Sequence, residues 1–269
     1  MRERLNLALS TLREAGFEWH GMTPLTGGLG NRLWRLSGHQ EWVLRLHNAD
    51  LDFCVDRQVE ARAWDACAAI DRAPRRLFWT AGFSLAQWGG AAPSPIDEAA
   101  LLDLMVDLHH INGDWPEVDP ASRIVAYLDE GASVLAPYLH RLNELTERLN
   151  RSALPKGFCH GDLHAGNLVV DEAGRWRALD FEYAGRASPL MDLAHWLSEA
   201  ANPEALWRHY LSQRQVSPGP EEWSAAQAAV SLYLMMCVAW CERMIRSGGD
   251  PIYSQWRNHY FEQMGAWLP

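Results

Sequence analysis

The apolar residues at the start of the chain repeat with the period of an α-helix. Spaced i, i+3, i+4 and i+7, the residues that form one face of this helix are Leu5, Ala8, Leu9 and Leu12. The predicted helix covers about residues 3–15 and ends at Gly16. Shorter apolar segments then predict strands at residues 33–36, 41–47, 77–79 and 83–88. A further helix is predicted over residues 55–70.

Helical periodicity dominates after residue 95. The segments with this pattern are residues 96–111, 123–149 as one long helix or two, a helix that opens at 189–194, and 203–213, 221–247 and 252–267. Two apolar runs, at residues 168–170 and 176–179, flank the turn residues 171–174 and predict a β-hairpin. The pattern therefore predicts an α+β chain with its strands mainly in the first third.

Composition places the chain among ordinary soluble globular proteins. It has 269 residues, of which 48% are hydrophobic and 22% charged, so neither disorder nor a fibrous protein is indicated. The formal net charge is −10. This charge argues against a nucleic-acid partner and is compatible with a cationic small-molecule substrate.

Cysteine usage and hydropathy bear on the compartment. Five cysteines, an odd number without the spacing of a disulfide framework, favour a reducing compartment. The basic N-terminal segment has a short, interrupted apolar part and is a poor signal peptide. The most apolar stretch, residues 225–241, contains Gln227 and Ser231, so we expect a buried helix and no membrane partner. We therefore expect a cytoplasmic protein.

Two groups of metal-ligand residues have a simpler structural explanation. Cys237 and Cys241 lie one helical turn apart without a partnering His/Cys pair, so buried thiols are favoured over a metal site. The adjacent His109 and His110 point to different faces of a helix. Structural or solvent-facing roles are expected for both histidines.

The stretch from Cys159 to Gly185 carries the most specific chemistry. Asp162 follows His160 and Gly161, Asn167 comes five residues after Asp162, and Asp180 comes thirteen residues after Asn167. Phosphoryl transfer needs a carboxylate aimed at the acceptor hydroxyl and oxygen ligands that hold Mg²⁺ on the nucleotide phosphates. Asp162 suits the first role and is the predicted catalytic residue. Asn167 and Asp180, which the hairpin would bring side by side, suit the second.

This stretch resembles the aminoglycoside phosphotransferase and choline kinase superfamily, whose members carry an HGDxHxxN loop and a later IDF or [IL]D[FW]E segment. The resemblance implies a two-lobed, protein-kinase-like α+β fold that uses ATP and Mg²⁺. Its N-lobe, an antiparallel sheet plus a helix, would be residues 1–88 and bind the nucleotide. Its larger, mainly helical C-lobe would be residues 89–269 and carry catalysis and substrate binding. The resemblance also implies structural roles for His160 and for Asp192, which braces the catalytic loop in the family's xDLA segment.

A glycine-rich turn early in the chain is the expected phosphate-covering loop. It contains Gly27, Gly28, Gly30 and Asn31. Glycines let backbone N–H groups approach phosphate oxygens closely, although an ordinary hairpin turn would have the same composition. The resemblance to the GGxSN-type loop of choline kinases favours the phosphate-covering interpretation. The sequence is neither Walker A nor GxGxxG, so a P-loop enzyme and a dinucleotide-binding domain are disfavoured.

The next strand carries Arg45 where most kinases have a lysine that pairs with the α/β-phosphates. Lys156 is the only lysine in the chain, so no other lysine can take this role in the N-lobe. Arginine supplies a permanent charge and a bidentate donor fork, and choline and thiamine kinase-like sequences, which this chain resembles, commonly carry it. Glu60 is its expected helix partner. The backbone of Gln87, Trp88 and Gly89 is the expected adenine-binding hinge.

Aromatic and acidic residues bear on the acceptor. Asp180 begins a DFEY run that places Glu182 where protein kinases have glycine, as in choline and thiamine kinase-like proteins, and Glu182 is predicted to touch a cationic substrate. Most of the 14 tryptophans are expected in the core. Trp240, and more weakly Trp196 and Trp256, are candidates for cation–π contact with the substrate. The C-terminal region from Trp240 to Trp256 resembles the tail of thiamine kinase-like sequences.

The sequence thus predicts an ATP-dependent phosphotransferase for the hydroxyl of a small cationic metabolite, with thiamine as the first candidate and choline or ethanolamine as the second. An aminoglycoside or sugar kinase is the alternative within the same enzyme class. The alternative from another class is a catalytically silent nucleotide-binding protein, a pseudokinase, which Arg45 in place of lysine supports most directly.

Overall fold

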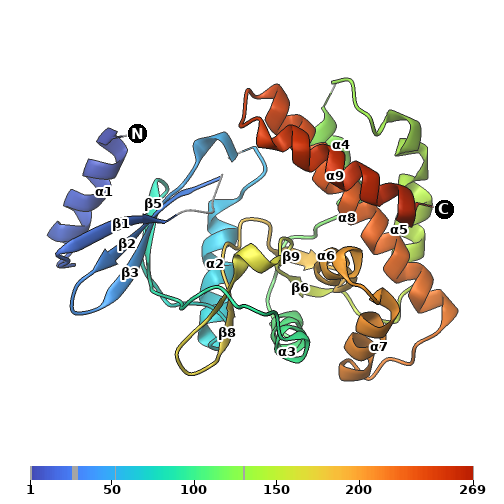
Figure 1. The fold of residues 1–269 in the computed structure, drawn as a ribbon, viewed down its shortest axis with the longest axis horizontal. Helices are drawn as coiled ribbons and strands as arrows, with labels where there is room; N and C mark the ends of the chain where they lie inside the picture. The colour runs from blue at the N-terminus through green and yellow to red at the C-terminus, as the bar shows by residue number, and fades with distance from the viewer. Residues whose placement is uncertain (1, 26–29, 52, 130, 269) are drawn as a thin grey trace. The chain divides into compact units, whose positions relative to one another are not determined.

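The computed structural model describes residues 2–25, 30–51, 53–129 and 131–268 (Figure 1). They form two compact units, each made of two chain segments. The first unit is Met1–Leu104 with Ala165–Ala184, and the second is Met105–His164 with Gly185–Pro269. The chain therefore enters the first unit a second time just after the HGD motif. The division into lobes at residues 88 and 89 stays a prediction.

A five-stranded antiparallel sheet forms the first unit, with its strands in the order β1-β2-β3-β5-β4. The strands are β1 (Gly21–Leu25), β2 (Arg32–Ser37), β3 (Glu41–Leu46), β4 (Arg76–Trp79) and β5 (Phe83–Gln87). The predicted α+β class is confirmed. β1 was not predicted, because Gly21 and Pro24 leave it with little strand signal.

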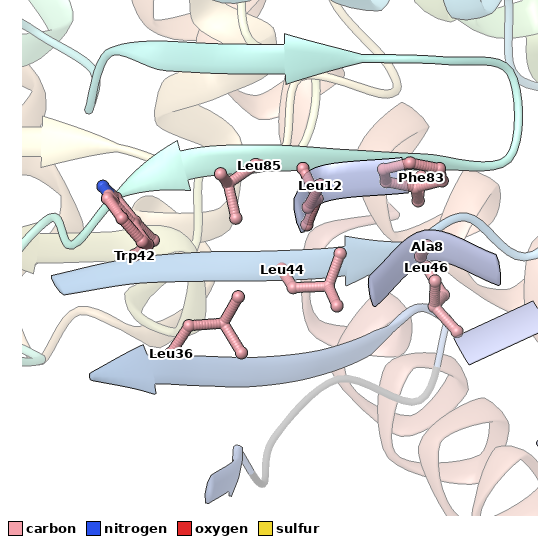
Figure 2. Close-up of a cluster of buried hydrophobic side chains, with 8 residues drawn as sticks. All are labelled: Ala8, Leu12, Leu36, Trp42, Leu44, Leu46, Phe83 and Leu85. Carbon is pink, nitrogen blue, oxygen red and sulfur yellow. The ribbon is translucent and has the colours of Figure 1, made fainter. Parts of the chain in front are cut away.

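The helix α1 (Arg2–Glu14) covers one face of this sheet. Figure 2 shows its Ala8 and Leu12 lying over side chains from β2, β3 and β5, and all eight residues drawn there are buried. The sheet contributes Leu36, Trp42, Leu44, Leu46, Phe83 and Leu85. The predicted apolar face of the first helix is confirmed, and Gly16 follows that helix with φ +87°, the left-handed conformation that commonly ends helices.

The helix α2 (Arg57–Ala69) follows β3 and starts at a side-chain cap. The Asp56 carboxylate accepts hydrogen bonds from the backbone N–H groups of Gln58 at 2.9 Å and Val59 at 3.1 Å. Burial of Ala63 and Trp64 fixes the face that the helix turns inward, and Glu60 lies on the buried side with them. A carboxylate is therefore carried into the interior of the unit.

The second segment of the first unit is the predicted hairpin. The turn η3 (Ala165–Asn167) leads into β7 (Leu168–Val170), which pairs with β8 (Trp176–Ala178). Val170 also exchanges two backbone hydrogen bonds with Ala91, at 2.8 and 3.1 Å. Gly90 is required there, because a Cβ atom on it would lie 2.0 Å from the Val170 carbonyl oxygen. These contacts attach the hairpin to the segment that follows β5.

Helices make up most of the second unit. They are the end of α3 (Glu98–His109), then α4 (Pro120–Leu128), η2 (Ala136–Arg141), α5 (Leu142–Asn150), α6 (Leu190–Glu199), α7 (Pro203–Gln213), α8 (Pro220–Arg246) and α9 (Ile252–Trp267). The pattern over residues 123–149 left one long helix or two open, and the structure has two. Pro137, which cannot donate a helix hydrogen bond, lies in the 3₁₀ turn between them.

The long helix α8 runs beside α9 and is the centre of this unit (Figure 1). It also packs against α4, α5 and α6. Among the described residues it alone has the length and composition of a membrane-crossing helix, yet 72% of its most apolar window is buried. We therefore interpret α8 as a core helix, as the sequence predicted.

Two short strands, β6 (Gly157–Cys159) and β9 (Gly185–Ala187), pair antiparallel in the second unit. Neither was predicted, because three residues are too few to show an alternating pattern. The HGD motif begins directly after β6, and β9 starts where the chain returns from the first unit. This strand pair therefore holds the chain that precedes the HGD motif beside the chain that follows residues 165–184.

His47, directly after β3, is a buried histidine that stays neutral. Its Nδ1 atom lies 3.1 Å from the Ala81 carbonyl oxygen, and its Nε2 atom lies 3.3 Å from the Ser84 hydroxyl. An N–H on Nδ1 donating to the carbonyl, with Nε2 accepting from the hydroxyl, satisfies both contacts. Burial, and then the charge of Arg45, lower the pKa of His47 to about 4.

We expect His47 to make the stability depend on pH. The unfolded histidine takes up a proton near its ordinary pKa of about 6.5, whereas the folded one does so only near pH 4. Its contribution is therefore present above about pH 6.5 and is lost as the pH falls toward 4, by up to about 3 kcal/mol. Urea unfolding at several pH values between 4 and 7 measures this contribution. In His47→Asn, whose amide can still donate to Ala81, the free energy of unfolding should change less with pH than in the wild type. An equal pH dependence in the two proteins would contradict this assignment.

Candidate active site

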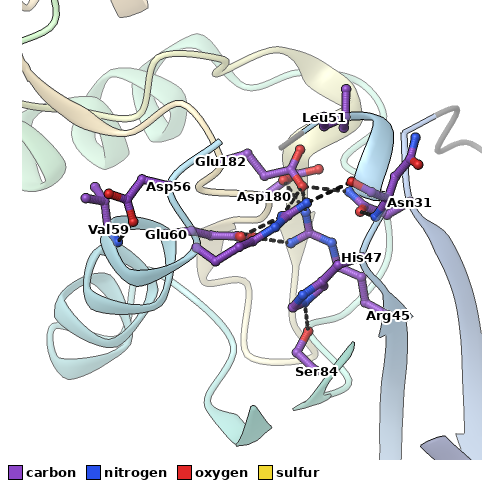
Figure 3. Close-up of polar contacts among 12 residues, drawn as sticks. Asn31, Arg45, His47, Leu51, Asp56, Val59, Glu60, Ser84, Asp180 and Glu182 are labelled. Carbon is purple, nitrogen blue, oxygen red and sulfur yellow. Dashed lines mark hydrogen bonds and ion pairs between the residues drawn. The ribbon is translucent and has the colours of Figure 1, made fainter. Parts of the chain in front are cut away.

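Arg45 on β3 is the centre of a buried cluster of charges in the first unit (Figure 3). Its Nη1 donates to Glu60 Oε1 at 2.6 Å, and its Nη2 donates to Asp180 Oδ1 at 2.8 Å and to Glu182 Oε1 at 2.5 Å. Burial would lower the pKa of Arg45, but the Asp180, Glu60 and Glu182 carboxylates outweigh it and hold that pKa above its usual value. The expected pair of Arg45 with Glu60 is present, and Asp180 joins it.

A second arginine, Arg57 at the start of α2, completes the cluster. Its Nη1 donates to Glu60 Oε2 at 2.8 Å and to Glu182 Oε1 at 2.6 Å, and its Nη2 donates to the Asn48 carbonyl oxygen at 3.2 Å. The sequence analysis missed this residue. The signal was present, because Arg57 precedes Glu60 by one helical turn and therefore shares its face.

Glu182 is the most densely paired carboxylate of this cluster. Its Oε1 accepts from Arg45, from Arg57 and, at 3.0 Å, from the Asn31 side-chain amide. Although burial opposes ionisation, the charges of Arg45 and Arg57 hold the pKa of Glu182 below its usual value. Glu182 is therefore part of the charge cluster. Its predicted contact with a cationic substrate stays a prediction.

Of the predicted glycine-rich loop, Gly27 and Gly28 lie outside the described residues. Gly30 is described, and Asn31 directly after it is buried. The Asn31 side-chain oxygen accepts from the Asn48 N–H at 3.0 Å, while its amide donates to Glu182. The end of the predicted phosphate loop is thereby tied to the segment that carries Asp180.

The predicted adenine-binding backbone is partly committed to the sheet. The N–H of Gln87 donates to the Arg75 carbonyl oxygen and the N–H of Trp88 donates to the Glu41 carbonyl oxygen, both at 2.9 Å. The Trp88 ring lies against the Arg35 guanidinium, 4.3 Å from its centroid. The adenine contact of Gln87, Trp88 and buried Gly89 stays a prediction.

Asn167 and Asp180 lie at the two ends of the hairpin, as predicted. The Leu179 N–H donates to the Asn167 carbonyl oxygen at 2.9 Å, which places the next residue, Asp180, beside Asn167 along the chain pair. Asp180 has φ +65°, a left-handed conformation that aspartate tolerates better than most residues. Its side chain is 34% exposed, in contrast to buried Glu60 and Glu182.

These donors fit a hard divalent cation such as Mg²⁺. One carboxylate oxygen from each of Glu60, Asp180 and Glu182 lies within 4.8 Å of the other two. Three carboxylates face the two arginines, so the cluster keeps one negative charge. Magnesium prefers carboxylate and amide oxygens and keeps several of its waters. Asp180, the most exposed of the three, together with Asn167 would hold the ion.

The HGD motif follows β6 in the second unit. His160 is fully buried, and its Nδ1 accepts from the Asp162 N–H at 3.3 Å. Gly161 has φ +81°, so a glycine is favoured at this turn. The Asp162 side chain is 36% exposed and lies 3.6 Å from His164 Nε2. The loop therefore presents a carboxylate with a histidine beside it.

Asp192, in the first turn of α6, holds this loop through its backbone. Its Oδ2 accepts from the His160 N–H at 2.8 Å and its Oδ1 accepts from the Gly161 N–H at 2.7 Å. The Asp192 side chain is completely buried. These contacts are those of a residue that braces the loop, which is the role predicted for Asp192.

The three candidate tryptophans lie in two places of the second unit. Trp196 on α6 donates from its indole N–H to the Leu163 carbonyl oxygen at 2.7 Å, directly after Asp162. Trp240 and Trp256 each contact the Tyr253 ring edge to face, with centroids 5.3 and 5.7 Å apart. Trp196 therefore contacts the loop that carries Asp162, while the other two form an aromatic group between α8 and α9.

Sequence reasoning missed the residues that surround Asp162. His195 on α6 has its Nδ1 3.1 Å from the Tyr233 hydroxyl, and its ring centroid lies 6.0 Å from that of His164. Burial, and then the charge of His164, lower the pKa of His195 to about 4, so it is neutral near pH 7. The second histidine of the HGDxH motif, His164, was the sequence feature that could have indicated histidines near Asp162.

Breaking the charge cluster should cost more stability than breaking a surface ion pair. We expect Glu182→Gln to lower the free energy of unfolding by about 3 kcal/mol, because two buried arginines lose a shared counter-charge. The matched control is Glu41→Gln, whose carboxylate pairs with Arg35 at the surface and should change stability by less than about 1 kcal/mol. Urea unfolding at pH 7 measures both. Similar losses for the two variants would show that the cluster contributes no more than a surface pair.

Residues 21–228 match the family model of the phosphotransferase enzyme family. Thiamine kinase of Escherichia coli O17:K52:H18 is 28% identical over 137 residues, which is 51% of this chain and 45% of the relative. The chain thus spans about half the length of this curated relative.

Solved structures share the fold over nearly the whole chain. A choline/ethanolamine kinase family protein from Mesorhizobium loti superposes with a TM-score of 0.75 at 21% identity, covering 93% of this chain and 88% of that one. A type I macrolide 2′-phosphotransferase superposes with a TM-score of 0.66 at 16% identity, covering 95% and 96%. These likenesses confirm the predicted kinase-like fold. Because the family model covers most of its length, this chain belongs to the phosphotransferase enzyme family.

Proposed function

We propose that this protein is an ATP-dependent kinase that phosphorylates the hydroxyl group of a small cationic metabolite, thiamine first and choline or ethanolamine second. The observation that carries the proposal is the contact of Asp180 with Arg45, which Glu60 holds in place. It joins a cation suited to nucleotide phosphates and a carboxylate suited to Mg²⁺ in one buried cluster. The proposed lobes remain residues 1–88 and 89–269. Residues 165–184, which carry Asn167 and Asp180, belong to the same compact unit as the proposed nucleotide-binding lobe.

In the proposed reaction Asp162 orients the acceptor hydroxyl and takes its proton. The hydroxyl oxygen forms a bond to the γ-phosphorus of ATP, the bond from that phosphorus to the β,γ-bridging oxygen breaks, and ADP leaves. Bound Mg²⁺ would neutralise charge on the phosphate oxygens. Arg45 would bind the phosphates, and the loop containing Gly27, Gly28 and Gly30 would cover them.

The acceptor preference follows from two observations. The E. coli relative is a thiamine kinase. Trp240 and Trp256, which pack against the buried Tyr253 ring, are indoles of the kind that bind cations through their faces. The fold shared with a macrolide 2′-phosphotransferase supports the alternative, an aminoglycoside or sugar kinase. The pseudokinase alternative loses its main support, because Arg45 makes the helix-glutamate contact that the usual lysine would make.

A reducing, cytoplasmic location is part of the proposal. The five cysteines, all among the described residues, form no disulfide. Such thiols persist in compartments where disulfides do not form.

Replacing Asp162 tests the chemistry. We expect Asp162→Asn to lower kcat by about 10²- to 10⁴-fold, because the amide cannot accept the hydroxyl proton, while ATP binding changes little. ADP release should be measured with ATP and Mg²⁺ against thiamine, choline, ethanolamine, aminoglycosides and simple sugars, with the variant as blank. ADP release with an aminoglycoside as the acceptor would instead assign the protein to the aminoglycoside kinases. Intact nucleotide binding with no ADP release on any acceptor would favour the pseudokinase.

Replacing Asp180 tests the metal role. Asp180→Asn keeps a residue type that tolerates the left-handed backbone, and the side chain at this position is 34% exposed. Losing its charge should therefore cost less stability than Glu182→Gln, whose side chain is buried. The Mg²⁺ concentration for half-maximal ADP release should rise at least about tenfold, because the ion loses a charged ligand. An unchanged Mg²⁺ dependence, measured by titration at fixed ATP, would remove Asp180 from the metal site.

A further inference from the structure

The helix α2 ends on an aspartate where helices most often have glycine. Asp71 follows the C-cap residue Ile70 and has φ +60°. The Asp71 N–H donates to the Ala68 carbonyl oxygen at 3.1 Å. The next N–H, of Arg72, donates to the Cys67 carbonyl oxygen at 2.9 Å. This pair of bonds is the Schellman motif, whose left-handed position favours glycine because a Cβ atom is disfavoured there.

The charge of Asp71 is also unfavourable at this end of a helix. The carbonyl groups of the last helical turn carry partial negative charge, so a cation stabilises the turn and an anion does not. Backbone conformation and local electrostatics therefore both disfavour aspartate here. The reason for this residue lies in its tertiary contacts.

The Asp71 carboxylate pairs with two arginines of the β7–β8 hairpin. Its Oδ2 accepts from Arg175 Nη1, and its Oδ1 accepts from Arg177 Nη2. Both arginines also pair with Asp171. Its Oδ2 lies 2.8 Å from Arg175 Nη2 and 3.2 Å from Arg177 Nη1. Two carboxylates and two guanidinium groups thus form a cluster without net charge.

Arg177 lies mostly out of solvent within this cluster. Only 13% of its side chain is exposed, and its Nε also donates to the Asp71 backbone carbonyl oxygen at 3.4 Å. Successive residues of a strand point to opposite faces, and its neighbours Trp176 and Ala178 are buried on the other face of β8. All three nitrogens of the guanidinium therefore have a partner on the side of β8 that meets the end of α2.

Two further contacts join the same segments of the first unit. The Ala178 N–H donates to the Arg72 carbonyl oxygen at 2.8 Å, and Arg72 Nη1 donates to the Trp176 carbonyl oxygen at 3.4 Å. Ala178 lies two residues before Asp180. The end of α2 therefore meets the hairpin at the strand that leads into Asp180.

The helix α2 thus holds this segment from both of its ends. In its first turn Glu60 pairs with Arg45, which in turn pairs with Asp180. Directly after its last turn Asp71 pairs with the two hairpin arginines.

We infer that Asp71 is a positioning residue for the β7–β8 hairpin, acting through Arg175 and Arg177. It fixes β8 against the end of α2 and thereby sets the place of Asp180. The inference rests on the proposed function in one respect, because Asp180 is a proposed Mg²⁺ ligand. In this role Asp71 contacts neither the ion nor the nucleotide.

An ordinary surface ion pair is the competing explanation. The Asp71 side chain is 49% exposed, and an isolated exposed pair contributes little to stability. In that case Asp71 would only end the helix, and glycine would suit φ +60° better. The two explanations therefore predict different effects of Asp71→Gly on the hairpin.

The first test reads the hairpin by amide hydrogen exchange and needs no activity. In Asp71→Gly the N–H groups of Ala178 and Leu179 should exchange about 5- to 30-fold faster, because mostly buried Arg177 loses a counter-charge. Asp71→Asn, which tolerates the same backbone conformation, should give the same result because it also lacks the charge. Unchanged or slower exchange in either variant would overturn the inference.

Gln215 supplies a matched control for the relief of backbone strain. It follows α7 with φ +56°, and its side chain is exposed. Its N–H donates to the Ser212 carbonyl oxygen, and the N–H of Val216 donates to that of Leu211, which is again the Schellman motif. Gln215→Gly should raise the Tm by about 2 °C and leave the hairpin amides unchanged. Faster hairpin exchange in this control would also overturn the inference.

The second test measures the coupling of Asp71 with Arg177. Arg177→Gln alone should accelerate the exchange of the Ala178 N–H. The double variant with Asp71→Asn should exchange less than about twofold faster than the faster single variant, because both changes remove the same contact. Accelerations that multiply would show that the two residues act independently and would overturn the inference.

Kinetics then separate this inference from the proposed function. In an active wild-type enzyme, Asp71→Asn should raise the Mg²⁺ concentration for half-maximal ADP release about 3- to 10-fold, because a proposed metal ligand is displaced. A mere loss of folded protein would lower the maximal rate and leave this concentration unchanged. A wild type without kinase activity but with the expected exchange would refute the proposed function and leave the positioning role supported. An unchanged Mg²⁺ dependence in an active enzyme would refute the positioning role alone.

Discussion

The ion pairs of Arg45 connect three parts of the first unit, namely β3, α2 and the segment after the β7–β8 hairpin. A permanently charged guanidinium that is taken out of water must be matched by counter-charges, and it finds them on α2 and on the segment after the hairpin. Its two terminal nitrogens donate to different carboxylates at the same time, which a lysine ammonium, as a single point charge, does less well. Arginine at this position is therefore part of an ion-pair cluster that also contains Glu182 and Arg57. Its presence is no sign of lost function.

The second unit holds its loop by a different physical means. Asp192 is fully buried and is matched mainly by hydrogen-bond donors, two from the loop backbone and one from His109. A buried carboxylate with directed donors has a narrow choice of orientations. The two aspartates therefore differ in environment: buried Asp192 holds backbone N–H groups of its loop, and partly exposed Asp180 pairs with a buried arginine.

Some elements were predicted from the local sequence pattern, and others exist only because of their tertiary pairing. The helices α7 and α9 begin and end where the sequence placed them, because Pro and turn residues mark their ends. The hairpin β7–β8 was found from its turn. By contrast β1, β6 and β9 were missed, since short or Pro-containing strands owe their existence to a pairing partner and leave little periodic signal.

The sequence by itself determined the family resemblance, the fold class, and the motif residues Asp162, Asn167 and Asp180, because these follow from spacing within a short stretch. Only the tertiary structure decided the partners of Glu182, Arg57 and His109. Glu182 meets Asn31 across 151 positions of the chain, and His109 meets Asp192 across 83. Whether a buried carboxylate faces a substrate or two arginines depends on which distant charge is folded against it, and no local pattern records that partner.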